Sequence, residues 1–277
     1  MAENKLIHSH ADPMFFDELP LWSAPFGLQL LETIPVISHG RVLDVGCGTG
    51  FLSIEMAQRF GHETEIIALD IWQEGLEYLN KKAEFYGIKN IKAIRASAEA
   101  LPFQDGSIDM VVSNNGINNS DNFMKSFKEA CRVIKTGGYF AIAQNHRGTF
   151  DGFYNILLET LIENNRYELV NAVQKHIRKK RKTTLILNRE LQKHGFIIFG
   201  AKNNSFTFRF ASANAFYQHH FIKSAFYSSW EELLGKYSEK ILSEVLKKLD
   251  KIVKSEGQLT LEVPFSTIIG RKAPGME

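Results

Sequence analysis

Residues 42–50 read Val-Leu-Asp-Val-Gly-Cys-Gly-Thr-Gly, and this stretch decides the fold class. Its apolar, β-branched start predicts a strand, and the glycines at positions 46, 48 and 50 predict a tight loop that leads into a helix. Without Cβ atoms, the backbone of such a loop can approach a ligand closely, and the helix then directs its N-terminus at that ligand. Glycine also serves strand-to-helix turns for purely steric reasons, so the loop alone leaves both interpretations open.

Two acidic residues indicate what kind of ligand the loop would hold. Asp70 follows a second predicted strand, 20 residues beyond Gly50, where a carboxylate can accept hydrogen bonds from both hydroxyls of a ribose. A dinucleotide fingerprint would need its last glycine at position 51, which is Phe51. Asp44 precedes the first glycine by two residues, which is unfavourable beside a pyrophosphate but compatible with a cofactor that carries an ammonium and a sulfonium. The charges therefore favour a cationic nucleoside over a dinucleotide.

The surrounding sequence predicts an α/β architecture. Short β-branched runs alternate with helical stretches, which is typical of strand-helix units around a parallel sheet. Asp121 is expected to cap the helix that begins near Phe123, and Gly137 and Gly138 are expected to end it. The predicted strands of this segment are residues 41–45, 65–69, 91–94, 109–113 and 139–143.

Beyond residue 145 the pattern becomes mostly helical, with strand character returning late in the chain. We find no internal repeat and no Pro/Gly/Ser-rich linker, so we predict one domain over residues 1–277 in which two helical segments serve as candidate lids. The predicted helical blocks are 150–194 and 213–253, and the strand-like runs are 196–199, 206–210, 259–263 and 266–270.

The composition excludes several classes of protein. The chain has 277 residues, 44% of them hydrophobic, and 33 Lys+Arg against 31 Asp+Glu leave a formal charge of +2, so no global field would hold it on nucleic acid or an anionic membrane. Two cysteines, Cys47 and Cys131, are too few for a disulfide framework and favour a reducing compartment. The N-terminus lacks the pattern of a secretory signal, and no run approaches the roughly 18 apolar residues of a membrane span. We therefore expect a cytoplasmic protein without a membrane span; its oligomeric state is left open.

The motif Asp-Val-Gly-Cys-Gly-Thr-Gly at 44–50 resembles motif I of class I S-adenosylmethionine-dependent methyltransferases. The resemblance is to the branch with a type 11 methyltransferase domain, which includes the ubiquinone/menaquinone C-methyltransferases, and it extends over roughly residues 40–145. It implies a Rossmann-like sheet of seven strands in the order 3-2-1-4-5-7-6, the last strand antiparallel. The implied parts are an N-terminal helical cover at 1–40, a cofactor-binding core at 41–145, helical substrate or lid segments at 146–195 and 211–256, and the last strand at 257–272.

The resemblance also implies the cofactor, S-adenosyl-L-methionine, whose product is S-adenosyl-L-homocysteine. The glycines would line the methionine moiety, Asp44 would reach its amino group, Asp70 would hold the ribose, and Ile71 would pack on the adenine. Residues 96–103 resemble a family segment whose Asp receives the adenine amino group, and Ser97 stands at that position here. The implied cofactor contacts are Asp44, Gly46, Cys47, Gly48, Gly50, Asp70, Ile71, Ser97, Ala98, Glu99 and Asn114.

The methyl acceptor is constrained less directly. Methyl transfer from a sulfonium is an in-line displacement, so positioning matters most, and a general base is optional. His146, just past the fifth predicted strand, is the best-placed candidate base, with a solvated loop histidine as the alternative. The strand-four end lacks Asn-Pro-Pro-Tyr, and the chain lacks a Pro-Cys nucleophile, which argues against amino groups of adenine or glutamine and against cytosine C5 as acceptors.

The substrate residues that we expect come from two segments. Asn115 and Asn118 belong to an amide-rich loop that suits a small polar group, although Asn is also common in turns. Trp22 and Phe26 lie in a segment that, in related enzymes, closes over the methionine end. The aromatic residues between Phe206 and Trp230 either wall an apolar acceptor pocket or pack into the core.

We predict a methyltransferase that acts on a small, partly apolar molecule. An RNA-modifying enzyme using the basic run Lys175–Lys182 is one alternative, although without a nucleic-acid module the run also fits a solvated helix face. A module that binds S-adenosylmethionine without transferring the methyl is a second alternative. No metal site is expected, because His8, His10 and the pair His219-His220 have no carboxylate or cysteine at ligand spacing.

Overall fold

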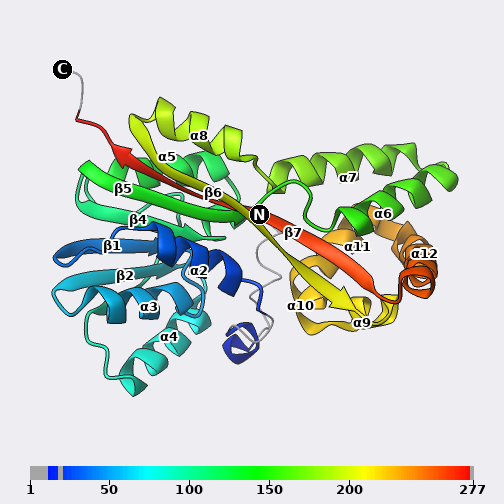
Figure 1. Cartoon of the computed structure of the whole chain (residues 1–277), viewed down its shortest axis with the longest axis horizontal. Helices are drawn as coiled ribbons and strands as arrows, with labels where there is room; N and C mark the ends of the chain where they lie inside the picture. Colours follow the sequence, from blue (N-terminus) through cyan, green and yellow to red (C-terminus); the bar gives the residue numbers. More distant parts are fainter. Residues whose placement is uncertain (1–11, 18–20, 275–277) are drawn as a thin grey trace. The chain divides into compact units, whose positions relative to one another are not determined.

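The structure, a computed structural model, describes residues 12–17 and 21–274 (Figure 1). Seven strands form one sheet in the order β3-β2-β1-β4-β5-β7-β6, and Figure 1 shows β7 running opposite to β6. The predicted strand order and the antiparallel last strand are confirmed. The strands are β1 Gly40–Val45, β2 Thr64–Asp70, β3 Ile91–Arg95, β4 Ile108–Asn114, β5 Ile134–Asn145, β6 Phe196–Phe210 and β7 Leu259–Lys272.

The chain groups into two compact units. The first, here called the sheet unit, comprises residues 12–17, 21–144, 183–203 and 265–274 among those described. The second, here called the helical unit, contains Asn145–Lys182 and Asn204–Pro264 among the described residues. The single domain expected over the whole chain stays a prediction.

The register of the sheet brings the predicted cofactor residues to one edge. β1 pairs in parallel with both β2 and β4, with Val42 opposite Ile66 on one side and Met110 on the other. β4 in turn pairs in parallel with β5. Because the carboxyl ends of these strands meet at the same edge, the glycine loop after β1, Asp70 at the end of β2 and Asn114 at the end of β4 share that edge.

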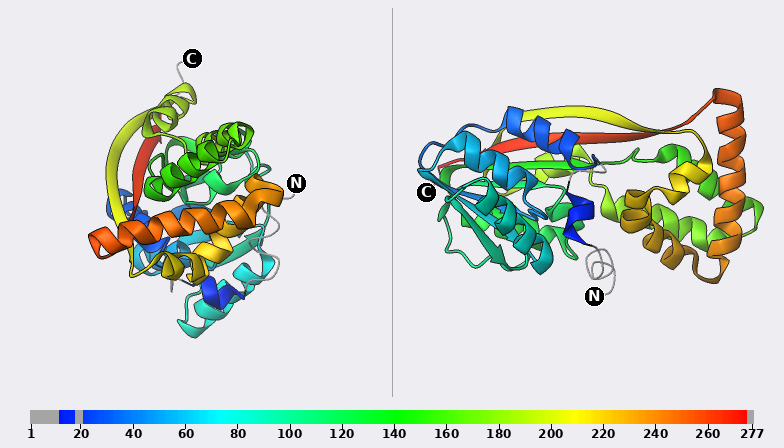
Figure 2. Two further views of the ribbon diagram at one scale, coloured as in Figure 1. Left: turned by 90° about the vertical axis from the view of Figure 1, so that its right-hand side faces the viewer. Right: turned by 90° about the horizontal axis from the view of Figure 1, so that it is seen from below.

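Helices cover the sheet as the period of the apolar residues predicts. Phe127 of α5 (Phe123–Val133) and Leu187 of α8 (Thr184–Lys193) pack with Leu43 and Val111 on one face of the sheet. Figures 1 and 2 show these two helices grouped apart from the helices at residues 24–33, 51–60 and 73–85. α8 belongs to the sheet unit, although the sequence places it in the helical segment 146–195. The helices of the sheet unit are α2 Ala24–Thr33, α3 Phe51–Phe60, α4 Gln73–Phe85, α5 Phe123–Val133 and α8 Thr184–Lys193, with the short turns η1 Pro13–Phe16 and η2 Ile117–Asn119.

The predicted ends of α5 are wrong. Asn122, not Asp121, is the N-cap, because its side chain accepts a hydrogen bond from the backbone N–H of Lys125 at 3.1 Å. α5 ends at Val133, and β5 begins one residue later, so Gly137 and Gly138 lie inside the strand. A Cβ at position 138 would lie 2.7 Å from a backbone oxygen of β4, so glycine is needed there for close strand pairing.

The two late strands are longer than the sequence indicates. β6 is continuous through the polar stretch 200–205, which separates the two predicted runs, and β7 is continuous through Pro264. Gln29 of α2 supports both strands, because its buried amide donates to the carbonyl oxygen of Lys202 and to the hydroxyl of Thr267, each at 3.1 Å. Long-range pairing therefore completes strands that local composition breaks.

The helical unit has a core of its own, built from aromatic side chains. Phe153 stacks on Trp230 with ring centroids 4.2 Å apart, and both are buried together with Phe216. For Phe216 and Trp230, packing into the core is therefore confirmed over lining a pocket. The helices of this unit are α6 Asp151–Glu163, α7 Tyr167–Lys180, α9 Ala213–Gln218, α10 His220–Ile222, α11 Ser228–Leu234 and α12 Ser238–Glu256, with the short turns η3 Lys223–Tyr227 and η4 Gly235–Tyr237.

Candidate functional site

The glycine loop has three glycines in the left-handed region, and only the middle one faces free space. Added Cβ atoms at Gly46 and Gly50 would lie 2.4 Å from the Cα of Gly116 and 2.3 Å from the Cδ1 of Leu79. A Cβ at Gly48 would meet nothing within 4 Å. Packing thus accounts for the outer two glycines, while the backbone at Gly48 is open to an approaching ligand.

Asp70 is held directly against this loop. Its Oδ2 accepts a hydrogen bond from the backbone N–H of Gly48 at 2.8 Å, and its Oδ1 accepts one from the N–H of Trp72 at 3.0 Å. A carboxylate offers about four lone-pair positions, so two acceptor positions remain for further donors such as ribose hydroxyls. The structure therefore brings Asp70 and the open glycine together.

Asp44 is a buried carboxyl group, 1% exposed, at the next-to-last position of β1 before the loop. Ser53 donates its hydroxyl to Oδ2 at 2.7 Å, whereas Oδ1 has no hydrogen-bond partner among the described residues. Burial, together with the nearby charge of Asp70, raises the pKa of Asp44 to about 7, although the bond from Ser53 opposes the shift. Such a group is well suited to receive a proton or a positive charge.

A second set of contacts around the loop has no counterpart in the sequence predictions. Asp17 accepts a hydrogen bond from the hydroxyl of Thr49 at 3.1 Å and also pairs with Lys82 of α4. These contacts connect the start of the chain to the glycine loop. Neighbouring Cys47 is a poor nucleophile, because burial and the charges of Asp70 and Asp44 raise the pKa of its thiol well above the usual value.

The predicted adenine-side residues follow β2 and β3. Ile71 is 48% exposed, so its apolar side chain is accessible to a ligand, although single exposed apolar residues are common on protein surfaces. The Ser97 side chain is exposed and accepts the N–H of Glu99 at 3.1 Å, which leaves a lone pair available; Ala98 is half-buried. The carboxylate of Glu99 accepts a hydrogen bond from the backbone N–H of Asn122 at 2.8 Å, so Glu99 holds the start of α5. Cofactor contacts by these residues stay predictions.

The amide-rich end of β4 combines a turn with orphaned acceptors. Asn114 donates to the carbonyl of Ser23 at 3.1 Å, and Asn115 adopts a left-handed φ of 56°, as a turn residue does. The side-chain carbonyl oxygens of Asn114 and Asn118 are buried without a hydrogen-bond partner. Within the described residues these two oxygens are free acceptors beside the glycine edge.

The predicted N-terminal substrate residues pack on each other. Trp22 is half-buried and lies 5.5 Å from Phe26, centroid to centroid. Phe26 is 0% exposed and contacts Phe265 edge-on at 4.7 Å, so it is a core residue of the sheet unit. Substrate contact by either residue stays a prediction. The remainder of the predicted cover at 1–11 and 18–20, including His8 and His10, lies outside the described residues.

His146 belongs to the helical unit, in the loop that follows β5. Its backbone N–H donates to the carbonyl of Pro264 at 3.1 Å, and its ring Nδ1 lies 2.9 Å from the carbonyl oxygen of Arg147. Because a carbonyl only accepts, Nδ1 carries the hydrogen, and Nε2 is the acceptor of the neutral ring. Its role as a base stays a prediction.

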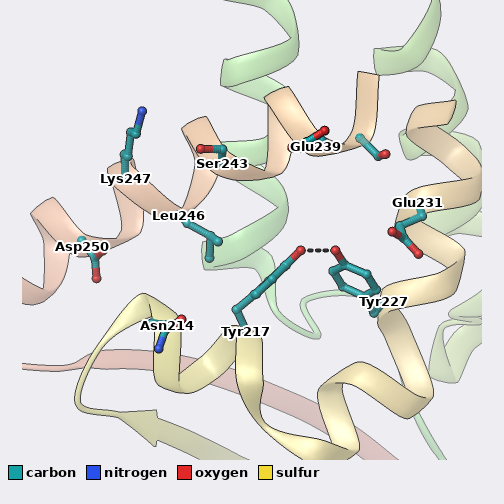
Figure 3. A pocket seen from close by; sticks show the side chains of 10 residues that line it. Asn214, Tyr217, Tyr227, Glu231, Glu239, Ser243, Leu246, Lys247 and Asp250 are labelled. Atoms are coloured by element: carbon teal, nitrogen blue, oxygen red, sulfur yellow. Dashed lines mark hydrogen bonds between the residues drawn. The ribbon is translucent and has the colours of Figure 1, made fainter. Parts of the chain in front are cut away.

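A pocket of about 670 Å³ lies in the helical unit, between α9, α11 and α12 (Figure 3). Tyr217 and Tyr227 face each other in it through their hydroxyl groups, and burial followed by this hydrogen bond raises the pKa of Tyr217 above its usual value. Glu231 and Asp250 also line the pocket, so its wall carries charged as well as aromatic side chains. Tyr217 and Tyr227 belong to the aromatic stretch that we expected either to wall an acceptor pocket or to pack into the core, and here they line a pocket. None of the other predicted cofactor or substrate residues lines it, and acceptor binding there stays a prediction.

Three further features bear on the expectations about metal, membrane and nucleic acid. Within residues 12–17 and 21–274, no group of histidine, cysteine and carboxylate side chains is arranged to hold a metal ion. No helix in that part of the chain has both the length and the apolar character of a membrane span. In the basic run, Arg178 and Lys179 are exposed, but Arg181 is buried.

Comparison with known proteins places this geometry in a family. A model of methyltransferase domains matches residues 37–195, more than half of the chain. The demethylmenaquinone methyltransferase of Geobacillus kaustophilus is 36% identical over 113 residues, which cover 41% of this chain and 48% of that protein. The chain thus spans about half the length of the curated relatives that it matches.

Solved structures share the fold over most of the chain. The YcgJ protein of Bacillus subtilis has a TM-score of 0.57 at 20% identity, covering 91% of this chain and 99% of that one. A putative methyltransferase from Bacillus halodurans has a TM-score of 0.59 at 16% identity, covering 90% and 99%. At such identities the likeness is one of fold alone.

Proposed function

The chain belongs to the methyltransferase domain family, and on that premise we propose that it transfers a methyl group from S-adenosyl-L-methionine to a small, partly apolar molecule. The observation that carries the proposal is the pairing of an open left-handed Gly48 with the Asp70 carboxylate that accepts its N–H. When bound, the cofactor supplies an electrophilic methyl on a sulfonium, and a nucleophile displaces it in line.

The residues of the edge suit that cofactor. A buried Asp44 with one unpartnered carboxylate oxygen favours a positively charged group nearby and disfavours a pyrophosphate. Asp70 would accept the ribose hydroxyls with its remaining lone pairs, and exposed Ile71 would cover the adenine. The chain's contribution is to bind, to orient and to exclude water from the reacting atoms.

For the acceptor, the proposal rests on the end of β4 and on relatives. The orphaned oxygens of Asn114 and Asn118 can accept hydrogen bonds from a hydroxyl or amine of the substrate. The curated relatives act on demethylmenaquinone by name, which supports a small-molecule acceptor with an apolar part. If the acceptor loses a proton, Nε2 of His146 is the proposed recipient.

The cofactor assignment is tested by calorimetric titration with S-adenosylhomocysteine. Asp70→Ala should weaken binding by about 1.5 to 3 kcal/mol, or about 10- to 150-fold, the usual worth of hydrogen bonds to a charged group. Asp121→Ala, which changes an exposed aspartate, is the matched control and should bind as wild type does. An unchanged dissociation constant in Asp70→Ala, or no binding by the wild type, would remove the proposal.

Transfer itself needs a second experiment, because binding does not require turnover. Radiolabelled S-adenosylmethionine with a fractionated metabolite extract should yield a labelled small molecule. Tight cofactor binding without any labelled product would instead support a non-catalytic binding module. An RNA-modifying role is not favoured, and Lys179→Gln in the basic run, with its exposed side chain, should leave RNA binding in a salt series at its background level.

A further inference from the structure

Arg181, next to last in the basic run, is a buried cation. It is 4% exposed, whereas Arg178 on the preceding turn is exposed. In the part of the chain that the structure describes, no carboxylate pairs with Arg181. A desolvated guanidinium is costly unless its N–H groups are bonded, so its contacts indicate what it is there to hold.

Those contacts lead to the loop after β5. Nη1 of Arg181 donates to the carbonyl oxygen of Thr149 at 2.6 Å. The guanidinium lies over the ring of Tyr154, 4.7 Å from its centroid, and Nη2 is 3.4 Å from the Tyr154 hydroxyl. Trp230 donates its indole N–H to the same hydroxyl at 3.0 Å. Arg181 therefore joins the end of α7, the start of α6 and the loop at 146–150.

Thr149 passes this restraint on to His146. The Thr149 hydroxyl donates to the carbonyl oxygen of His146 at 2.8 Å and accepts the side-chain N–H of Asn145 at 3.1 Å. Both the carbonyl and the hydroxyl of Thr149 are thus used, one toward Arg181 and the other toward His146. Moving Arg181 would release the residue that closes the loop on His146.

The loop is also held in a conformation that it would not adopt alone. Phe150 has a φ of +59° and is 0% exposed, and a left-handed φ is a genuine outlier for a bulky residue. Its N–H donates to the carbonyl of Glu262 at 2.8 Å, and its ring lies 5.2 Å from that of Phe226, centroid to centroid. Such strain persists only where the surroundings enforce it, and it is concentrated at functional sites.

We propose that Arg181 is a positioning residue: through Thr149 it holds the loop 146–150 so that the His146 ring keeps its hydrogen on Nδ1 and presents Nε2 as a proton acceptor. The inference rests on the proposed methyl transfer for the use of that acceptor. The arrangement of the loop stands on contacts inside the helical unit. Arg181 of the basic run therefore holds the loop of a histidine in place and does not serve as a nucleic-acid contact.

The test is the tautomer of His146, measured by NMR on ¹⁵N-histidine-labelled full-length protein at pH 8, with His146→Gln to assign the signal. We expect the Nδ1–H form in the wild type. In Arg181→Met the ratio of the Nδ1–H to the Nε2–H form should fall about fivefold, which is the factor for losing one net hydrogen bond, here that from Nδ1–H to the Arg147 carbonyl. Arg178→Met, on the exposed side of α7, should leave the ratio unchanged. A folded Arg181→Met with the wild-type ratio would overturn the proposal.

Thr149→Val keeps the proposal testable if Arg181→Met does not fold. This variant removes the hydroxyl that bonds His146 but retains the carbonyl that Arg181 holds. The tautomer ratio should change as in Arg181→Met, and an unchanged ratio would sink the idea. Titration of the wild type with S-adenosylhomocysteine separates the two claims, because a wild type that binds none refutes the proposed function while the tautomer result still decides the role of Arg181.

Discussion

At the scale of single residues, Asp44 is one group through which pH acts on the fold. Its pKa is about 7 in the folded chain, against about 3.9 for an aspartate in an unfolded one. Between these values the native state binds a proton that the unfolded state releases, so the unfolding free energy falls as pH rises from about 4 to about 7. Above pH 7 both states are ionised, and this contribution no longer changes.

Asp44→Asn should remove that part of the pH dependence, because an amide of the same shape does not titrate. Urea unfolding at pH 5 and pH 7.5 should show a smaller loss of stability in the variant than in the wild type. Asp121→Asn, at an exposed aspartate, supplies the baseline. Parallel pH profiles for Asp44→Asn and wild type would show that Asp44 is not the titrating group.

Individual residues also show where sequence reasoning stops. Asp44, Gly48 and Asp70 could be chosen from spacing because they are close in the chain to a strand end, and a hydrogen bond joins Gly48 to Asp70 in the structure. The burial of Arg181 could not, because its partners come from a loop and a helix about 30 residues earlier. From sequence alone, every residue of a basic run is expected to be solvated, because the tertiary contacts that bury one of them come from distant parts of the chain.

At the scale of elements, the glycine loop contains glycines that packing requires and one that ligand binding would require. Gly48→Ala should fold, at a cost of about 1 to 2 kcal/mol for an alanine at its φ of +55°, yet should bind S-adenosylhomocysteine more weakly, because the Cβ occupies free space. Gly46→Ala should lose a further 1 to 3 kcal/mol, roughly, because its Cβ meets the backbone of Gly116. Thermal unfolding and calorimetry on both variants measure the two effects. Equal stability of the two would contradict this assignment.

The contact between the start of the chain and α4 makes a second prediction at this scale. Asp17→Asn keeps an acceptor for Thr49 but removes the charge that pairs with Lys82, both groups being partly screened by solvent. We expect a loss of roughly 0.5 to 1 kcal/mol in stability and weaker binding of S-adenosylhomocysteine. Glu63→Gln, at an exposed pair with His62, is the control. Unaltered cofactor binding would mean that Asp17 does not order the loop.

Among the elements, the first five strands were predictable because each has its own apolar run between turn residues. β6 was not predictable as one strand, since its middle is polar and only pairing with β7 makes it continuous. The N-cap of α5 was predicted wrongly because local composition does not decide between two neighbouring residues. Asp121 and Asn122 are both good caps by composition, and the backbone path selects the second.

At the scale of the whole molecule, the chain alternates between the two units, and β6 and β7 contribute residues to both. We therefore expect one cooperative unfolding transition, coincident by circular dichroism and tryptophan fluorescence. S-adenosylhomocysteine at 100 times its dissociation constant should raise the unfolding free energy by about 2.7 kcal/mol over that whole transition. Two transitions, only one of which responds to the ligand, would mean that the units are separate domains.

The open space at Gly48 also makes sequence variation informative. In a library of variants sorted only for folded protein, positions 46 and 50 should remain glycine, because neighbouring atoms occupy the place of a side chain. Position 48 should drift, toward asparagine first, since that residue tolerates a positive φ. Sorting the same library for growth that depends on the chain's activity should restore glycine there. Positions that differ between the two populations would then be the positions where a side chain blocks the ligand, and the ligand need not be identified for this comparison.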